Sequence, residues 1–163
     1  MALLEKRDEA EKPDAPRRRR DGREEALPRP GKAEGALAEA FLREHVFAAP
    51  PPNALFAGKL AAVPEGLPPL QGIKVLRAGL FLGEIRGRVF VPDHALALAC
   101  RPLRTLPLTE AQARAYQAGQ ALPAPDGAKG FFAPSFQDWP LGWAKASDGQ
   151  LKNHYPKGLR RPE

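Results

Sequence analysis

The part of the sequence that decides the fold is its C-terminal stretch, which reads WPLGWAK at residues 139–145 and then QLKNHYPKGLRR at residues 150–161. Both tryptophans of the protein lie here, together with one of its two tyrosines and a cluster of lysines and arginines. Cations neutralise phosphates and release counterions, and aromatic rings stack on unpaired bases. The composition of this stretch therefore favours a single-stranded nucleic acid as its ligand.

A purely structural role is an open alternative for the same residues. Trp139 and Trp143 could be core residues, since aromatic side chains are usually buried for their area. A basic C-terminal segment is often only a solvated chain end. Asn153 and Tyr155 could buttress the last turn, because polar turn residues are commonly satisfied locally. Composition alone leaves both interpretations open.

The overall composition limits the class of protein. The chain has 163 residues, a net charge of +6 and a pI of about 9.8, which predicts one domain with a polyanionic partner. Cys100 is the one cysteine, so an internal disulfide is excluded and a reducing cytoplasm is expected. No apolar run reaches the roughly 20 residues that span a bilayer, and none resembles a signal peptide. We expect a cytoplasmic monomer that does not enter a membrane.

The N-terminal residues 1–35 differ in composition from the rest. They carry ten Lys or Arg and nine Asp or Glu residues but no aromatic residue, Val, Ile or Thr. Such a segment buries too little apolar surface to offset its ordering entropy. It is predicted to be a disordered charged linker. The arginine run at 17–20 could contact phosphates or remain a solvated charge run.

Local signals predict short elements in residues 36–163, as 19 prolines and 15 glycines also suggest. Asp93 is a favourable N-cap, and Thr109 with Gln112 forms a capping-box pattern. Arg86-Gly87 and Asp148-Gly149 are typical hairpin tips. Helices are expected at residues 32–47, 95–101 and 110–118. Strands are expected at residues 55–63 (one bent strand or two short ones), 73–78, 80–85, 88–91, 129–133, 141–145 and 150–153.

Three segments carry a resemblance to a known family. The patterns Pro-Leu-Gly-Trp-x-Lys at 140–145 and Leu-Lys-Asn-x-Tyr-Pro-Lys-Gly-Leu-Arg at 151–160 resemble the C-terminal signature of bacterial 16S ribosomal RNA cytosine-5 methyltransferases of the RsmF type. Residues 73–84 (IKVLRAGLFLGE) with 90–99 (FVPDHALALA), and 116–120 (YQAGQ), are similar to two further segments of that family. The resemblance covers roughly residues 50–161, in the same order.

The resemblance implies a fold and a role. The fold would be α+β: a PUA-like small, mixed or antiparallel β-barrel with flanking helices over residues 36–163. This domain would bind small-subunit (16S) rRNA and present it to an S-adenosylmethionine-dependent catalytic domain outside this chain. Residues 1–6 resemble the end of that catalytic domain. The residues expected to bind RNA are Trp143, Lys145, Lys152, Asn153, His154, Tyr155, Lys157, Arg160 and Arg161, with Arg77 and Arg86 as additional candidates from the predicted hairpin.

Catalytic chemistry finds little support in the sequence. Methyl transfer to cytosine C5 needs a thiolate. Cys100 lies in an apolar predicted helix, so we interpret it as a buried structural cysteine. No glycine-rich strand-to-helix turn marks a cofactor site, and His45, His94 and His154 have no cysteine partner for a metal. We therefore assign no catalytic, cofactor or metal residues. A small enzyme with an unrecognised site, and a stand-alone RNA-binding or protein-interaction module in ribosome assembly, are the alternatives.

Overall fold

The computed structural model describes residues 27–68, 70 and 72–161 of the chain. Most of the predicted linker at 1–35 lies outside the described residues, as do the arginine run at 17–20 and the segment at 1–6. The first helix already begins at Lys32, four residues before the predicted start of the folded domain.

Helices separate runs of short strands along the described part of the chain. In chain order they are α1 (Lys32–His45), β1 (Val46–Phe47), β2 (Ala54–Phe56), β3 (Lys59–Ala62), β4 (Leu80–Arg86), β5 (Val89–Pro92), α2 (His94–Ala99), β6 (Arg101–Pro102), β7 (Thr105–Pro107), α3 (Glu110–Ala118), β8 (Leu122–Pro123), β9 (Gly130–Phe136), β10 (Trp139–Pro140), β11 (Ala144–Ser147), β12 (Gln150–Asn153) and the 3-10 helix η1 (Lys157–Leu159).

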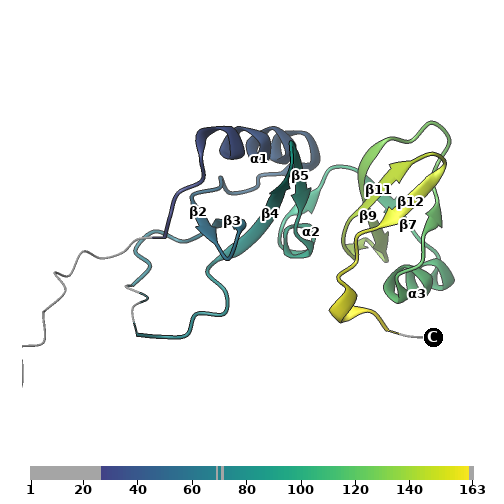
Figure 1. Ribbon diagram of the computed structural model, residues 1–163. Coiled ribbons are helices and arrows are strands. Elements are labelled where there is room, and N and C mark those ends of the chain that lie inside the picture. Colours follow the sequence, from purple (N-terminus) through teal and green to yellow (C-terminus); the bar gives the residue numbers. More distant parts are fainter. Residues whose placement is uncertain (1–26, 69, 71, 162–163) are drawn as a thin grey trace, which may run out of the picture.

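Two larger sheets form the two halves of the molecule (Figure 1). The N-terminal half is the antiparallel sheet β2-β3-β4-β5 with α1 and α2 beside it. The C-terminal half is the sheet β10-β9-β11-β12-β8 with α3, and β7 joins it by pairing in parallel with β9. A small antiparallel pair, β1 with β6, also connects distant parts of the chain. The predicted α+β class with small mixed sheets and flanking helices is confirmed.

The hairpins form where turn residues were expected. In β4–β5 Arg86 is opposite Val89, and Gly87 has a positive φ of 63°. In β11–β12 the turn is Asp148-Gly149, with φ values of 54° and 74°. Two consecutive residues with positive φ make a type I′ turn, whose twist matches that of the strands it joins. The segment predicted at 55–63 forms the two short strands β2 and β3.

The predicted helix caps are also present. The side chain of Asp93 accepts a hydrogen bond from the backbone N–H of Ala95 at 2.9 Å. Thr109 and Gln112 form the reciprocal capping box of α3. Helix α3 ends at Gly119, whose φ of 94° is left-handed. Each cap satisfies backbone groups that a helix end leaves unpaired.

Several predicted boundaries are wrong. Residues 73–78 form a loop, not a strand: no strand pairs with them, and the side chains of Ile73 and Leu76 are 62% and 80% exposed. The helix predicted to reach residue 47 ends at His45, because the chain turns into β1. The strand predicted at 141–145 starts only at Ala144.

The late start of β11 follows from the conformation of Gly142. Its φ is 150°, and a Cβ atom there would lie 2.7 Å from the Tyr116 hydroxyl and 2.9 Å from Nδ1 of His94. Glycine allows this close approach and lets the next residue, Trp143, turn into the core.

Trp143 is at the centre of a core that both halves share. Its side chain is 1% exposed, and its ring packs edge-on against Phe41 of α1 at 5.7 Å between centroids. Phe90 of β5 and Phe131 of β9 belong to the same cluster. The indole N–H donates to the backbone carbonyl of Asp93 at 3.1 Å, so the buried polar group is satisfied. A second cluster lies between α3 and the C-terminal sheet.

The two tryptophans should respond very differently to truncation. Trp143→Ala should lower the free energy of unfolding by about 3–5 kcal/mol, because it leaves a large cavity and an unpaired carbonyl. Trp139→Ala is the matched control: its side chain is 75% exposed, so a change within about 0.5 kcal/mol is expected. Urea unfolding followed by circular dichroism measures both. Equal losses would contradict the assignment of Trp143 to the shared core.

Candidate nucleic-acid interface

Two lysines face the same side of the C-terminal sheet. Lys145 of β11 and Lys152 of β12 are directly opposite in an antiparallel pair, so their side chains share one face. The alternating residues Ala144, Ala146 and Leu151 are buried on the other face, in the cluster with α3. Neither lysine forms an ion pair with a described acidic side chain. Because like charges directly opposite each other repel, this basic face (Lys145 and Lys152) is suited to an anion.

His154 connects the basic face to the N-terminal half. It directly follows β12, and its ring lies 5.3 Å from that of Phe131, edge-on. Burial lowers the pKa of the His154 imidazole, and the positive charges of Lys145 and Arg86 lower it further. Lys145 belongs to the C-terminal sheet and Arg86 to β4, so cations from both halves act on this one ring.

A groove of about 570 Å³ lies at the junction of the two halves. We call it the junction groove. The N-terminal half forms one wall with β3, β4, β5, α2 and the loop that precedes β4. The C-terminal half forms the other wall with the chain after β12. Its lining includes the side chains of Lys59, Arg77, Phe81, Glu84, Arg86, Asp93, His94, His154, Pro156 and Leu159.

Most charges in the junction groove are paired. Lys59 forms an ion pair with Asp93 at 2.5 Å, and Arg86 forms one with Glu84 at 2.5 Å. Arg77 has no described acidic partner, and its guanidinium carbon lies 4.8 Å from the centre of the Phe81 ring. The groove is therefore much less positive than the number of its basic residues suggests.

Asn153 supports the C-terminal segment. Its Nδ2 donates to the backbone carbonyls of Tyr116 and Gln120, both at 2.8 Å, and its Oδ1 accepts from the backbone N–H of Tyr155 at 2.7 Å. These bonds attach the chain after β12 to the end of α3. These contacts agree with the structural alternative for Asn153, and its assignment as an RNA-binding residue stays a prediction.

Tyr155 is held between two other rings. Its ring lies 5.2 Å from that of His94 and 5.5 Å from that of Tyr116, edge-on in both cases. The side chain is half-buried and links the N-terminus of α2 to α3. These contacts agree with a supporting role for Tyr155, which was the structural alternative for this residue.

Two predicted RNA-binding residues are placed differently from expectation. Trp143 was expected to stack on bases or to shape the groove. Its ring is buried and so is not exposed for stacking, while a role in shaping the groove stays a prediction. Arg160 lies over Gly119: a Cβ atom there would come within 2.6 Å of its side chain, and the Arg160 Nε is buried without a hydrogen-bond partner. Its side chain therefore packs against the end of α3.

The remaining predicted cations are on the surface. Lys157, at the start of η1, is exposed. Arg161 is exposed too, and its backbone N–H donates to the carbonyl of Gln117 at 3.3 Å. The additional candidates Arg77 and Arg86 both line the junction groove. The structure thus brings Lys145, His154 and Arg86 together and places Trp143 and Arg160 in supporting positions.

Several groove residues were not predicted as site residues from the sequence, among them Lys59, Phe81 and His94. Lys59 and Phe81 face each other across β3 and β4, with the Lys59 ammonium 5.2 Å from the Phe81 ring centre. His94 was interpreted as a packing or capping residue, yet it lines the groove. Only strand pairing and the docking of the two halves bring these side chains together, so no local motif marks them.

Other kinds of site receive no support from the described residues. Among residues 27–68, 70 and 72–161, no group of three or more His, Cys, Asp or Glu side chains is arranged to hold a metal ion. In the same part of the chain, no helix has the length and apolar character needed to cross a membrane.

Comparisons with known proteins match both halves of the chain. Residues 40–100 match the family model of the RsmF rRNA methyltransferase first C-terminal domain, and residues 103–161 match that of the methyltransferase RsmF PUA domain. The second match confirms the predicted PUA-like fold. The two matches divide residues 36–163, predicted as one domain, into two family units.

A curated relative agrees with the family models. Over 105 residues, the chain is 32% identical to the ribosomal RNA small subunit methyltransferase F of Klebsiella pneumoniae (strain 342). The aligned region is 60% of this chain and 21% of the relative. The chain thus spans about a fifth of the length of that relative. It belongs to the RsmF family of rRNA methyltransferases, of which it carries the first C-terminal domain and the PUA domain.

Proposed function

We propose that this chain binds small-subunit ribosomal RNA through its basic face and presents it to the catalytic domain of an RsmF-type methyltransferase. By this proposal the target is a cytosine, the methyl donor is S-adenosylmethionine, and the chain works as a monomer in the cytoplasm. The catalytic domain would lie outside the 163 residues, as expected from the share of the relative that the chain spans.

The observation that carries the proposal is the pair of unpaired lysines on one face of the PUA unit. Lys145 and Lys152 repel each other in the free protein, and a phosphate bound between them would relieve that repulsion and release counterions. The opposite face of the same sheet is covered by α3. RNA can therefore approach these strands from one side only, the side that also leads to the junction groove.

The described residues do not fit the catalytic step. Cys100 follows α2 as its C-cap, and burial raises the pKa of its thiol, so the thiol stays protonated near neutral pH. A protonated, half-buried thiol is a poor nucleophile. This agrees with a role in binding, and we derive no methyl-transfer step through residues of this chain.

Removal of either lysine of the basic face should weaken RNA binding. Lys145→Ala and Lys152→Ala should each lower the affinity for a 16S rRNA fragment and flatten the plot of log affinity against log salt by about one unit, since each removes one phosphate contact. Fluorescence anisotropy across a salt series measures both quantities.

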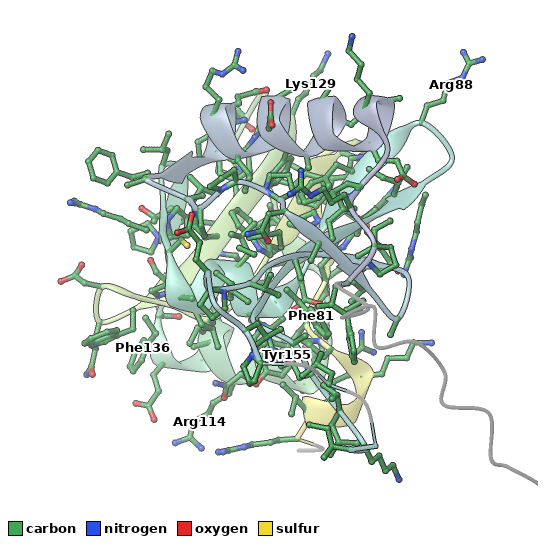
Figure 2. The ribbon with its side chains drawn as sticks, turned by 90° about the vertical axis from the view of Figure 1, so that its left-hand side faces the viewer. Phe81, Arg88, Arg114, Lys129, Phe136 and Tyr155 are labelled. Atoms are coloured by element: carbon green, nitrogen blue, oxygen red, sulfur yellow. The ribbon has the colours of Figure 1, made fainter. Side chains whose placement is uncertain are left out.

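Arg114→Ala is the matched control for this experiment. Arg114 is an exposed cation of α3 on the opposite side of the sheet, paired with Glu110 at 2.6 Å, and it points away from the molecule in Figure 2. Its removal lowers the net charge equally but should leave the slope unchanged. If all three variants lost RNA affinity equally, binding would depend on net charge alone and not on the basic face. Absence of salt-dependent binding would also contradict the proposal.

RNA affinity should rise as the pH falls from 7 toward 5.5. His154 is neutral at pH 7 because its pKa is below the ordinary value. Protonation adds a positive charge beside Lys145, and bound phosphates favour the charged imidazole, so RNA binding takes up a proton. His154→Gln should remove most of this pH dependence with little change in affinity at pH 7.5. The same pH profile in both proteins would exclude His154 from the interface.

A further inference from the structure

We infer that the junction groove holds one unpaired nucleotide of the bound RNA, with the ring of Phe81 as the stacking surface for its base. This inference rests on the proposed RNA binding and adds a second contact region, contributed by the first C-terminal domain. It assigns a base-binding role to residues outside the PUA unit.

Phe81 has the surroundings of a stacking surface. Its half-buried ring is supported by the ring of Phe56 at 6.1 Å between centroids, with 27° between the two ring planes. The Arg77 guanidinium lies over the ring, 4.8 Å from its centre, and the Lys59 ammonium, which is paired with Asp93, lies over it at 5.2 Å. Arg77 has no described acidic partner, so it is the cation that can hold the phosphate of a base stacked at this site.

A β-bulge sets the position of this ring. On β3, Leu60 pairs with Gly83 and the next residue, Ala61, pairs with Phe81, so Leu82 is the extra residue of β4. Leu82 is fully buried in the shared core, whereas Phe81 lines the groove. Bulges commonly redirect a side chain at functional sites. Here the bulge leaves a large aromatic residue at the groove surface beside a core residue.

The charge balance favours a base over a free phosphate as occupant. Lys59 and Arg86 are already paired with Asp93 and Glu84, so little positive charge is available to an additional anion. The carboxylate of Glu84 can accept from base amino groups, and the His154 imidazole can donate to a base whether it is neutral or protonated. The volume of about 570 Å³ lies within the range of about 300–1,000 Å³ usual for ligand sites.

The groove also continues directly from the basic face. His154 lines the groove and lies near enough to Lys145 for that lysine's charge to affect it. An RNA strand whose phosphates contact Lys145 and Lys152 therefore passes the groove entrance. A base turned out of that strand reaches Phe81 without a second binding event.

The test compares Phe81 variants on three RNA probes in anisotropy titrations. The probes are a labelled oligouridine, the same oligonucleotide without bases, and an RNA duplex. Phe81→Ala and Phe81→Leu should weaken oligouridine binding by about five- to 150-fold, the factor expected for losing one stacked base. Phe81→Trp should preserve it. No variant should change binding to the base-free or duplex probe.

Phe47→Ala is the matched control, since Phe47 is a 62% exposed phenylalanine outside the groove. It should bind all three probes as the unchanged protein does. Ultraviolet cross-linking to oligouridine provides a readout without substitution: the modified tryptic peptide should be residues 78–86, which contains Phe81. This readout decides the question even if a Phe81 variant fails to fold.

The two proposals fail in different ways. If the Phe81 variants bind oligouridine normally, or cross-links avoid residues 78–86, while Lys145→Ala and Lys152→Ala still weaken binding, the groove inference is wrong and the proposed function stands. If the unchanged protein binds none of the three probes and no 16S rRNA fragment, both are wrong.

Discussion

The burial of Trp143 is the constraint on which the rest of the structure depends. Its indole ring fills the shared core against Phe41, and its N–H bonds to the carbonyl of Asp93 in the N-terminal half. Its own carbonyl accepts from the Tyr116 hydroxyl at 2.8 Å and from the backbone N–H of His154 at 3.1 Å. One residue thus fixes the two halves and the chain that enters the junction groove. The groove exists because this contact holds its walls together.

Local chemistry made a large part of the fold predictable. The caps at Asp93 and Thr109 and the Asp148-Gly149 turn are each determined by residues within a few positions of one another, so a pattern in the sequence suffices. The basic face was predictable for the same reason, since a two-residue turn fixes the register that places Lys145 opposite Lys152.

The rest depends on contacts between distant segments. Trp139 is exposed and Trp143 is buried. Gly142 allows Trp143 to turn inward, but its burial is completed only when α1 docks against the C-terminal sheet. The parallel pairing of β7 with β9 and the approach of Lys59 to Phe81 are likewise set by tertiary packing. Residues 73–78 have a strand-like composition, but they pair with no strand in the described part of the chain, so strand propensity alone gave the wrong prediction.

The shared core has a consequence for the order of folding during synthesis. Phe41 and Trp143 come from opposite ends of the described chain, and contacts between residues so distant in sequence form late. The N-terminal sheet cannot complete its core until the PUA unit has left the translating ribosome. The first C-terminal domain therefore needs the PUA unit to finish folding, although the two match separate family models that meet near residue 100. A nascent chain stalled before Trp143 would expose apolar surface around Phe41 and Phe90, a natural target for a chaperone.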